Sequence, residues 1–244
     1  MAVRPEKSPV IRMDSVVKSY GGLRPLRLRR FTLNAGEGVG LAGFDRTMAE
    51  VFVNLTTGAT LPEQGEVAVF GRATSSIADS AEWLATVDRF GIVSERIVLL
   101  DQLTSAQNIA MSLTLDIDPV PEAIRGSVDA LGREVGLTGE ALGAPVGTAT
   151  TGVRQRVRLA RAIAANPSVL LIEHPRAGLS DDEVAAFAAD LARLADVRGV
   201  AVVVLAADAD HARPFAPRVL VLNGATGELA EPKKAGLLSR LMGT

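Results

Sequence analysis

The sequence lacks cysteine altogether and contains few aromatic residues. Among its 244 residues there are no cysteines, one tryptophan and one tyrosine. Disulfides, thiolate nucleophiles and cysteine-based metal sites are therefore excluded. A chain without cysteine is natural in the reducing interior of a cell, although it fits any compartment. We expect an intracellular protein whose chemistry does not involve a thiol.

Long hydrophobic runs are also missing. The longest apolar stretches, such as Val169–Ile172 and Gly199–Ala207, fall well short of the roughly 20 residues that a membrane-spanning helix needs. The polar segment Met1–Pro9 has no apolar core of a signal peptide. The sequence therefore predicts a cytoplasmic protein that is at most peripheral to a membrane.

Neither sign of charge dominates the chain. The 26 basic and 28 acidic residues give a formal net charge of -2, so no overall positive field favours nucleic acid or an anionic bilayer. The four lysines are Lys7, Lys18, Lys233 and Lys234, which leaves 22 arginines (26 − 4) and no lysine from Ser19 to Pro232. With two histidines and no cysteine, no metal-ligand cluster stands out. We predict neither a nucleic-acid partner nor a protein metal site.

Apolar segments and turn signals alternate along most of the chain, which favours an α/β fold with a largely parallel sheet. The segments Val10–Met13 and Leu26–Leu33, the second alternating and rich in arginine, indicate an antiparallel layer beside that sheet. Between Leu99 and Gly152 helical patterns predominate. We therefore expect one domain over residues 1–244, with a helical subdomain at about 98–152.

The other predicted elements follow from periodicity and from turn residues. The predicted strands are Gly38–Ala42, Glu66–Phe70, Val169–Ile172, Val200–Leu205 and Arg218–Leu222. The predicted helices are Thr47–Thr57, Ser105–Leu113, Pro121–Val135, a shorter one before Gly143, Val153–Ala165, Asp181–Leu194, a short one near His211–Phe215, and one from Lys234.

A glycine-rich stretch coincides with the first predicted parallel strand. The glycines from Gly38 to Gly43 match the spacing of a dinucleotide-binding turn, but the apolar run lies inside the motif and not before it. The alternative is a P-loop, in which glycine amides cradle phosphates, a lysine neutralises them and a hydroxyl holds magnesium. Counted from Gly43, the second glycine, the lysine and the hydroxyl fall on Met48, Ala49 and Glu50. None of these residues has the required chemistry.

Several segments read together resemble the ATP-binding cassette (ABC) transporter ATPases. In chain order they are Gly40–Gly58, Gly65–Gly71, Leu99–Ile109, Thr151–Ile163, Val169–Leu179 and Arg218–Leu222. They are similar to that family's first nucleotide-binding region, the segment after its Q-loop, its signature helix, its Walker B and D-loop stretch, and its closing strand. The resemblance implies a P-loop NTPase-like ABC ATPase fold with a parallel-sheet core, an antiparallel β layer and a helical subdomain.

The same resemblance implies that most catalytic positions are replaced. The P-loop lysine becomes Ala49, the magnesium-binding hydroxyl becomes Glu50, and the Q-loop glutamine becomes Glu95. Glu173 stands in place of the Walker B aspartate, and His174 stands where the family has its general-base glutamate. The chain therefore resembles a cassette with degenerate catalytic motifs.

A few positions keep the family's chemistry. Thr150 and Gly152 retain one hydroxyl and one glycine of the signature pattern, and Tyr20 aligns with the aromatic residue that stacks on adenine. Packing against a strand edge is an equally good role for Tyr20. The family's switch histidine becomes Ala207, while His211, four positions later, is predicted to lie on a helix surface. The arginines of the signature-like helix are expected to be solvated or ion-paired.

Three functions remain open at this point. The first is a degenerate cassette subunit that pairs with an active ABC ATPase subunit and with membrane permease subunits, peripheral to the inner face of the cell membrane. The second is a divergent but active ATPase that hydrolyses Mg-ATP, with His174 as its base. The third is a nucleotide-independent regulatory module. Loss of the lysine and the hydroxyl favours the first and third, and the retained signature residues favour the first over the third.

Cofactor and partner expectations follow from the same resemblance. In the family each ATP lies between the P-loop of one subunit and the signature loop of the other, so Thr150 and Gly152 are expected to offer a hydroxyl and an N–H to ATP held by a partner. ATP and magnesium are then expected in a complex, whereas the isolated chain binds neither tightly and does not hydrolyse ATP. A homodimer would have no working P-loop, which implies a heterodimer.

Overall fold

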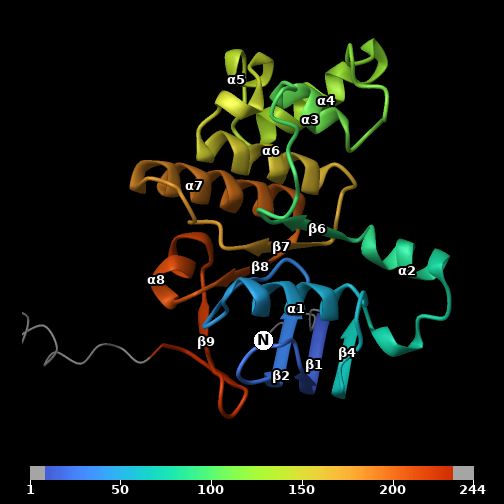
Figure 1. Ribbon diagram of the computed structural model, residues 1–244, viewed down its shortest axis with the longest axis vertical. Helices are drawn as coiled ribbons and strands as arrows, with labels where there is room; N and C mark the ends of the chain where they lie inside the picture. The colour runs from blue at the N-terminus through green and yellow to red at the C-terminus, as the bar shows by residue number, and fades with distance from the viewer. Residues whose placement is uncertain (1–8, 233–244) are drawn as a thin grey trace, which may run out of the picture.

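The structure is a computed structural model, and it describes residues 9–232. The helix predicted from Lys234 lies outside the described residues. Two sheets form the body of the described chain, with helix α1 between them and further helices on the far face of the larger sheet (Figure 1).

The larger sheet has six strands in the order β10-β9-β3-β8-β7-β6, of which five run parallel and β10 is an antiparallel edge. The strands are β3 (Gly38–Ala42), β6 (Phe90–Val93), β7 (Val169–Glu173), β8 (Ala201–Ala206), β9 (Val219–Asn223) and β10 (Glu228–Ala230). Every residue of β7 and β8 is buried, as expected for parallel strands that are covered on both faces.

The smaller sheet is antiparallel and has the order β2-β1-β4-β5. Its strands are β1 (Pro9–Lys18), β2 (Leu26–Asn34), β4 (Gln64–Val69) and β5 (Arg72–Ala73). Helix α1 (Arg46–Thr56) lies across this sheet (Figure 1). Its Phe52 packs edge-on against Phe31 and Phe44, with ring centroids 5.8 Å away in each case. One hydrophobic core therefore joins the antiparallel layer, α1 and one face of the larger sheet.

A second core lies on the other face of the larger sheet, under α6 (Thr151–Ile163) and α7 (Asp181–Arg198). Beyond α6 lie α3 (Ser105–Ala110), α4 (Glu122–Glu134) and α5 (Glu140–Gly143) (Figure 1). The remaining helical segments are α2 (Ser80–Val87), α8 (Ala209–Ala212), and the 3-10 turns η1 (Thr74–Ser76), η2 (Val146–Thr148) and η3 (Arg213–Phe215). None of the helices in the described chain is both long enough and apolar enough to cross a membrane.

The α/β fold with a parallel-sheet core, an antiparallel layer and a helical region is confirmed. The sequence did not predict strands β5, β6 and β10 or helix α2. Strand β6 has four residues, too few to show a period, and helix α2 buries none of its side chains, so it has no apolar stripe to detect. The helix predicted to reach Leu113 ends at Ala110. The division of the chain into a domain and a subdomain stays a prediction.

Candidate functional site

Four of the positions that the resemblance assigns to the nucleotide site meet in a cleft of about 260 Å³ at the carboxyl ends of β6 and β7, the edge at which α/β sheets bind ligands. Its walls are the first turns of α1, the end of β7 and the segment between β6 and α3, residues 94–104, which we call the linker. The lining residues are Arg46, Thr47, Glu50, Ser94, Glu95, Arg96, Glu173 and His174. The structure thus brings Glu50, Glu95, Glu173 and His174 together, as the resemblance implies.

Helix α1 begins within the stretch that a P-loop would use to hold phosphate. The helix starts at Arg46, three residues before Ala49, and Asp45 is its N-cap. The Asp45 carboxylate accepts the Met48 N–H at 2.7 Å, and the Asp45 carbonyl oxygen accepts the Ala49 N–H at 2.9 Å. In a P-loop such N–H groups face the phosphates. Here the chain's own aspartate already uses them.

The two residues that should hold the nucleotide's charge are differently placed. Ala49 is fully buried in the core that α1 shares with the antiparallel layer. Glu50 is half-exposed and lines the cleft. Gly43 serves the turn between β3 and α1: its φ is 89°, and a Cβ there would lie 3.2 Å from the Leu222 carbonyl oxygen. The position that the resemblance assigns to the lysine thus holds a buried methyl group, and the position that it assigns to the magnesium-binding hydroxyl holds a carboxylate.

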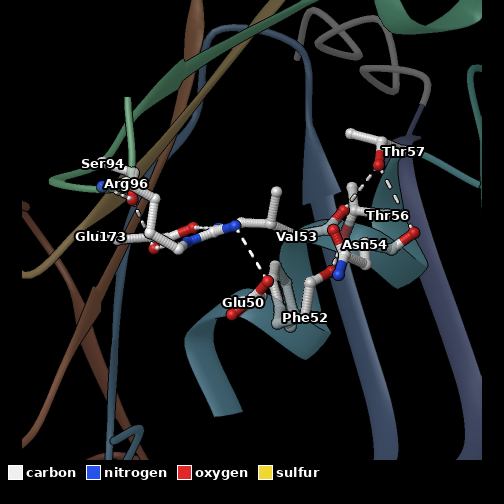
Figure 2. Close-up of polar contacts among 9 residues, drawn as sticks. All are labelled: Glu50, Phe52, Val53, Asn54, Thr56, Thr57, Ser94, Arg96 and Glu173. Atoms are coloured by element: carbon white, nitrogen blue, oxygen red, sulfur yellow. Dashed lines mark hydrogen bonds and ion pairs between the residues drawn. The ribbon is translucent and has the colours of Figure 1, made fainter. Parts of the chain in front are cut away.

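An arginine from the linker occupies the space between two carboxylates (Figure 2). Nη1 of Arg96 lies 3.1 Å from Oε1 of Glu50, Nη2 pairs with Oε1 of Glu173, and Nε donates to Oε2 of Glu173 at 3.3 Å. The Ser94 hydroxyl donates to the same Glu173 oxygen at 2.8 Å. Glu173 is only 6% exposed, and a buried carboxylate needs such partners. Arg96 supplies the positive charge that faces the buried Glu173 carboxylate.

The charge on Arg96 is permanent. Burial lowers the pKa of the Arg96 guanidinium, but its hydrogen bond to Glu173 and the charges of Glu173 and Glu50 outweigh burial, so the pKa is raised. The sequence contains no lysine from Ser19 to Pro232 that could replace the missing one. The structure shows that a cation reaches the site from a distant segment.

Sequence reasoning missed Arg96. The sequence does carry one signal for Arg96, which is complementary charge. Arg46 and Glu50 lie four residues apart on α1, with the positive charge first, whereas Glu95 and Arg96 are adjacent on the linker, with the negative charge first. Arg46 pairs with Glu95 at 2.5 Å, as Glu50 pairs with Arg96. A single sequence does not report that the two segments face each other.

His174 and Tyr20 are the remaining predicted contacts at this end of the sheet. His174 lines the cleft, and its buried Nε2 has no hydrogen-bond partner among the described residues. Its backbone φ of 46° is unusual for a residue other than glycine. Tyr20 follows β1 and packs partly buried against the core; burial, and then the charge of Asp45, raise the pKa of its phenol. Tyr20 is not among the residues that line the cleft.

These residues do not fit a magnesium–triphosphate group. Three carboxylates line the cleft against two arginines, and both arginines are already paired with those carboxylates. The first N–H groups of α1 are capped by Asp45. No three His, Cys, Asp or Glu side chains within residues 9–232 are arranged to hold a metal ion. We therefore derive no hydrolytic step through this cleft.

Replacing the α1 cap tests whether Asp45 is all that keeps phosphate out. We expect Asp45→Ala to lower the free energy of unfolding by about 1 kcal/mol, as loss of an N-cap does, and to create no affinity for ATP, because Glu50 and Glu173 remain. Urea unfolding with and without Mg-ATP measures both. The matched control is Asp79→Ala, which removes the N-cap of α2. An ATP-dependent gain in stability confined to Asp45→Ala would contradict the expectation.

The signature-like loop lies at the start of α6. Thr150 caps that helix, since its hydroxyl accepts the Val153 N–H at 3.3 Å. The Gly152 N–H donates to Oε1 of Glu183 at 3.2 Å, and a Cβ on Gly152 would lie 2.7 Å from that oxygen. Glu183 also completes the capping box of Ser180 at the start of α7. The Gly152 N–H is therefore engaged within the chain, and it becomes available to a partner's nucleotide only if Glu183 moves.

The contact between Glu183 and Gly152 should depend on pH. The Ser180 N–H, followed by the Thr150 hydroxyl and the Gly152 N–H, lowers the pKa of Glu183. A lowered folded-state pKa means that the contact is fully present above the ordinary glutamate value of about 4.3 and is lost as pH falls through the folded value. The amide nitrogen shift of Gly152, measured by NMR, should titrate below about pH 4.3 and not in Glu183→Gln. Titration at higher pH, or in that variant, would contradict this assignment.

Two of the four arginines of α6 are ion-paired, as predicted. Arg154 pairs with Asp101 at 2.9 Å, and Arg156 pairs with Asp190 at the same distance. Arg158 differs from the prediction because it is buried, and its Nε donates to the Ile97 carbonyl oxygen at 3.2 Å.

The short helix α8 carries the second histidine, as expected from the sequence. His211 is half-exposed on α8 and its Nδ1 lies 2.7 Å from Asp208 Oδ1. The prediction of a surface histidine there is confirmed.

Comparison with known proteins decides the family. A protein-family model described as ABC transporter matches residues 27–177, more than half of the chain. The chain belongs to the ABC transporter family. Within that family it is 29% identical over 217 residues to the methionine import ATP-binding protein MetN of Brucella abortus (strain 2308), covering 88% of the chain and 58% of MetN. The chain thus spans less than two thirds of that relative.

Other relatives match at similar levels. The lipoprotein-releasing system ATP-binding protein LolD of Alcanivorax borkumensis is 28% identical, with 86% of the chain and 92% of LolD covered. Among solved structures, cbiO1 of Clostridium perfringens has a TM-score of 0.76 at 18% identity, over 92% of the chain and 87% of cbiO1. The dimeric cassette MJ0796 bound to ADP and Pi has a TM-score of 0.71 at 25% identity, over 92% and 98%. The ABC ATPase fold is therefore shown.

Proposed function

We propose that this ABC family member is a degenerate ATP-binding cassette subunit that pairs with an active ATPase subunit and serves membrane permease subunits. One observation carries the proposal: Arg96 lies between Glu50 and Glu173, in the place where a working cassette would hold metal and phosphate. The site is thereby complete without a nucleotide. In this function the chain sits at the cytoplasmic face of the cell membrane, peripheral to the permease.

The names of the relatives support the general role. MetN and LolD are named as ATP-binding proteins of an import system and of a lipoprotein-releasing system, so relatives of this chain serve more than one kind of system. The transported substrate and its direction are left open for this chain. ATP and magnesium belong, in this proposal, to the site formed with the active partner.

A second function, the nucleotide-independent regulatory module, is favoured by one contact. Glu183 already uses the Gly152 N–H and places a carboxylate at the loop that would face a partner's phosphate. The two functions differ in what Glu183→Gln does to the activity of the native complex. A degenerate cassette gains turnover, because the partner's phosphate meets less negative charge, whereas a regulatory module shows no change in turnover.

Purification of the tagged full chain from its native host, in mild detergent, tests the assembly. We expect a second cassette with an intact P-loop lysine and a membrane permease to copurify in one complex. A chain that purifies as a homodimer with Mg-ATP turnover of its own would contradict the proposal. A complex without any second cassette would favour the regulatory module.

A further inference from the structure

The linker carries two adjacent charges that match two charges on α1. Glu95 pairs with Arg46 at 2.5 Å, and Arg96 pairs with Glu50 at 3.1 Å. Arg46 and Glu50 are four residues apart and so lie on one face of the helix. The two ion pairs therefore fix both the position and the direction of the linker along α1.

A third contact anchors this arrangement to the larger sheet. Arg96 pairs with Glu173 at the end of β7, and Glu173 also accepts the Ser94 hydroxyl at 2.8 Å. Glu173 is buried, so water screens this contact less than the pairs at the rim. We call the set Arg46, Glu50, Glu95, Arg96 and Glu173 the clasp. Arg96 is its central member, since its guanidinium contacts both α1 and β7.

The far side of the linker is held by α6. Arg158 donates to the Ile97 carbonyl oxygen at 3.2 Å, and Arg161 donates to the Val98 carbonyl oxygen at 2.9 Å. Further along, Asn108 of α3 accepts the Leu100 N–H at 2.9 Å. The linker is therefore bound to the sheet and α1 at one end and to the helical region at the other. Its position determines how these two parts are joined.

We propose that Arg96 is a positioning residue that clasps the linker to α1 and β7, so that the linker keeps its place in the absence of any nucleotide. The cation that holds the segment is part of the chain. Nucleotide binding at this site then does not displace the helices that follow the linker. The lack of a nucleotide effect rests on the proposed function, whereas the clasp itself does not.

Hydrogen–deuterium exchange on the full chain tests the clasp. In the unchanged protein the amides of residues 94–100 should exchange slowly, and Arg96→Ala should speed their exchange by at least about tenfold, which corresponds to about 1.4 kcal/mol. The matched control is Arg218→Gln: Arg218 lies 3.1 Å from Glu37, and its side chain is 45% exposed against 44% for Arg96. That control should leave the linker unchanged.

Two further variants separate positioning from mere stability. Arg96→Ala combined with Glu173→Gln removes the unpaired buried charge, so the double variant should recover most of the lost thermal stability while its linker still exchanges fast. Arg96→Lys keeps the charge but lacks the planar fork that reaches two carboxylates, and its linker should exchange at an intermediate rate. Recovery of linker protection together with stability in the double variant would overturn the proposal.

Hydrogen–deuterium exchange measured with millimolar Mg-ATP tests the clasp and the proposed function separately. Unchanged exchange at residues 43–50 and 94–100 is expected. If Mg-ATP slows exchange at residues 43–50 while Arg96→Ala still frees the linker, the proposed function fails and the clasp stands. If Arg96→Ala and Arg218→Gln give the same linker exchange, the clasp is overturned whatever ATP does.

Discussion

The purified chain should show no magnesium-dependent ATPase activity above background. Removing a single preorganised donor that stabilises charge in the transition state costs about 10²–10³ in rate. Here Ala49 and Glu50 replace the lysine and the hydroxyl together, and His174 replaces the general base. Such losses do not add simply, but a rate at least about 10³-fold below that of an intact cassette is expected.

A phosphate-release assay on the isolated chain checks this result. The rate of phosphate release should be the same, within error, for the unchanged chain, Glu173→Gln and His174→Ala, because we expect no nucleotide on which either residue could act. Magnesium-dependent turnover by the unchanged chain that is abolished by His174→Ala would show an active, divergent ATPase. That outcome would contradict the degenerate function directly.

The second large effect is an asymmetry within the native complex. We expect replacement of the P-loop lysine in the active partner to abolish turnover, while changes in the cleft of this chain have little effect. Ala49→Asp is a poor probe because Ala49 is fully buried, and Gly152→Asp is equally poor because its Cβ would meet Glu183 at 2.7 Å. Threonine-to-aspartate changes at the starts of α1 and α6 avoid both problems.

Thr47→Asp and Thr150→Asp form the matched pair. Thr47 is exposed in the cleft, and aspartate in the first turn of α1 is stabilised by the helix dipole. Thr150 is the N-cap of α6, and aspartate is an equally good N-cap. Both variants should therefore fold. Thr47→Asp should leave turnover within about twofold, whereas Thr150→Asp should lower it at least about tenfold, because each 1.4 kcal/mol of charge repulsion is tenfold.

Equal losses from the two variants would show that both sites of the complex work. Full activity after Thr150→Asp would show that the signature-like loop of this chain does not face the partner's nucleotide. Far-ultraviolet circular dichroism and the unfolding midpoint of each variant serve as the check that the substitution did not simply unfold the chain.

The fold was predictable to the extent that burial leaves a pattern. The strands from Val169 and from Val200 are buried on both faces and read as continuous apolar runs, and β2 alternates leucine with arginine. Strand β6 left no such pattern because it is only four residues long. The sequence indicates where the core lies, and it is weakest where an element is short or exposed.

The sequence predicted which residues lie at the site, but it did not predict which of them are in contact. The resemblance places Glu50, Glu95, Glu173 and His174 at one site, and the structure finds them in one cleft. It does not predict that Arg96 joins Glu50 to Glu173, since residues 50, 96 and 173 are far apart in the chain. Long-range ion pairs depend on how the linker folds, and no periodic pattern in the local sequence indicates them.

Calorimetric titration of the isolated full chain with Mg-ATP tests most directly whether the internal ion pairs have replaced the nucleotide. We predict no saturable heat up to millimolar Mg-ATP, either for the unchanged chain or for Glu50→Ser, because Ala49 supplies no cation and Asp45 caps α1. Saturable binding of Mg-ATP by the unchanged chain anywhere below millimolar concentration would contradict this prediction, and would show that Asp45 and Arg96 give way to the nucleotide.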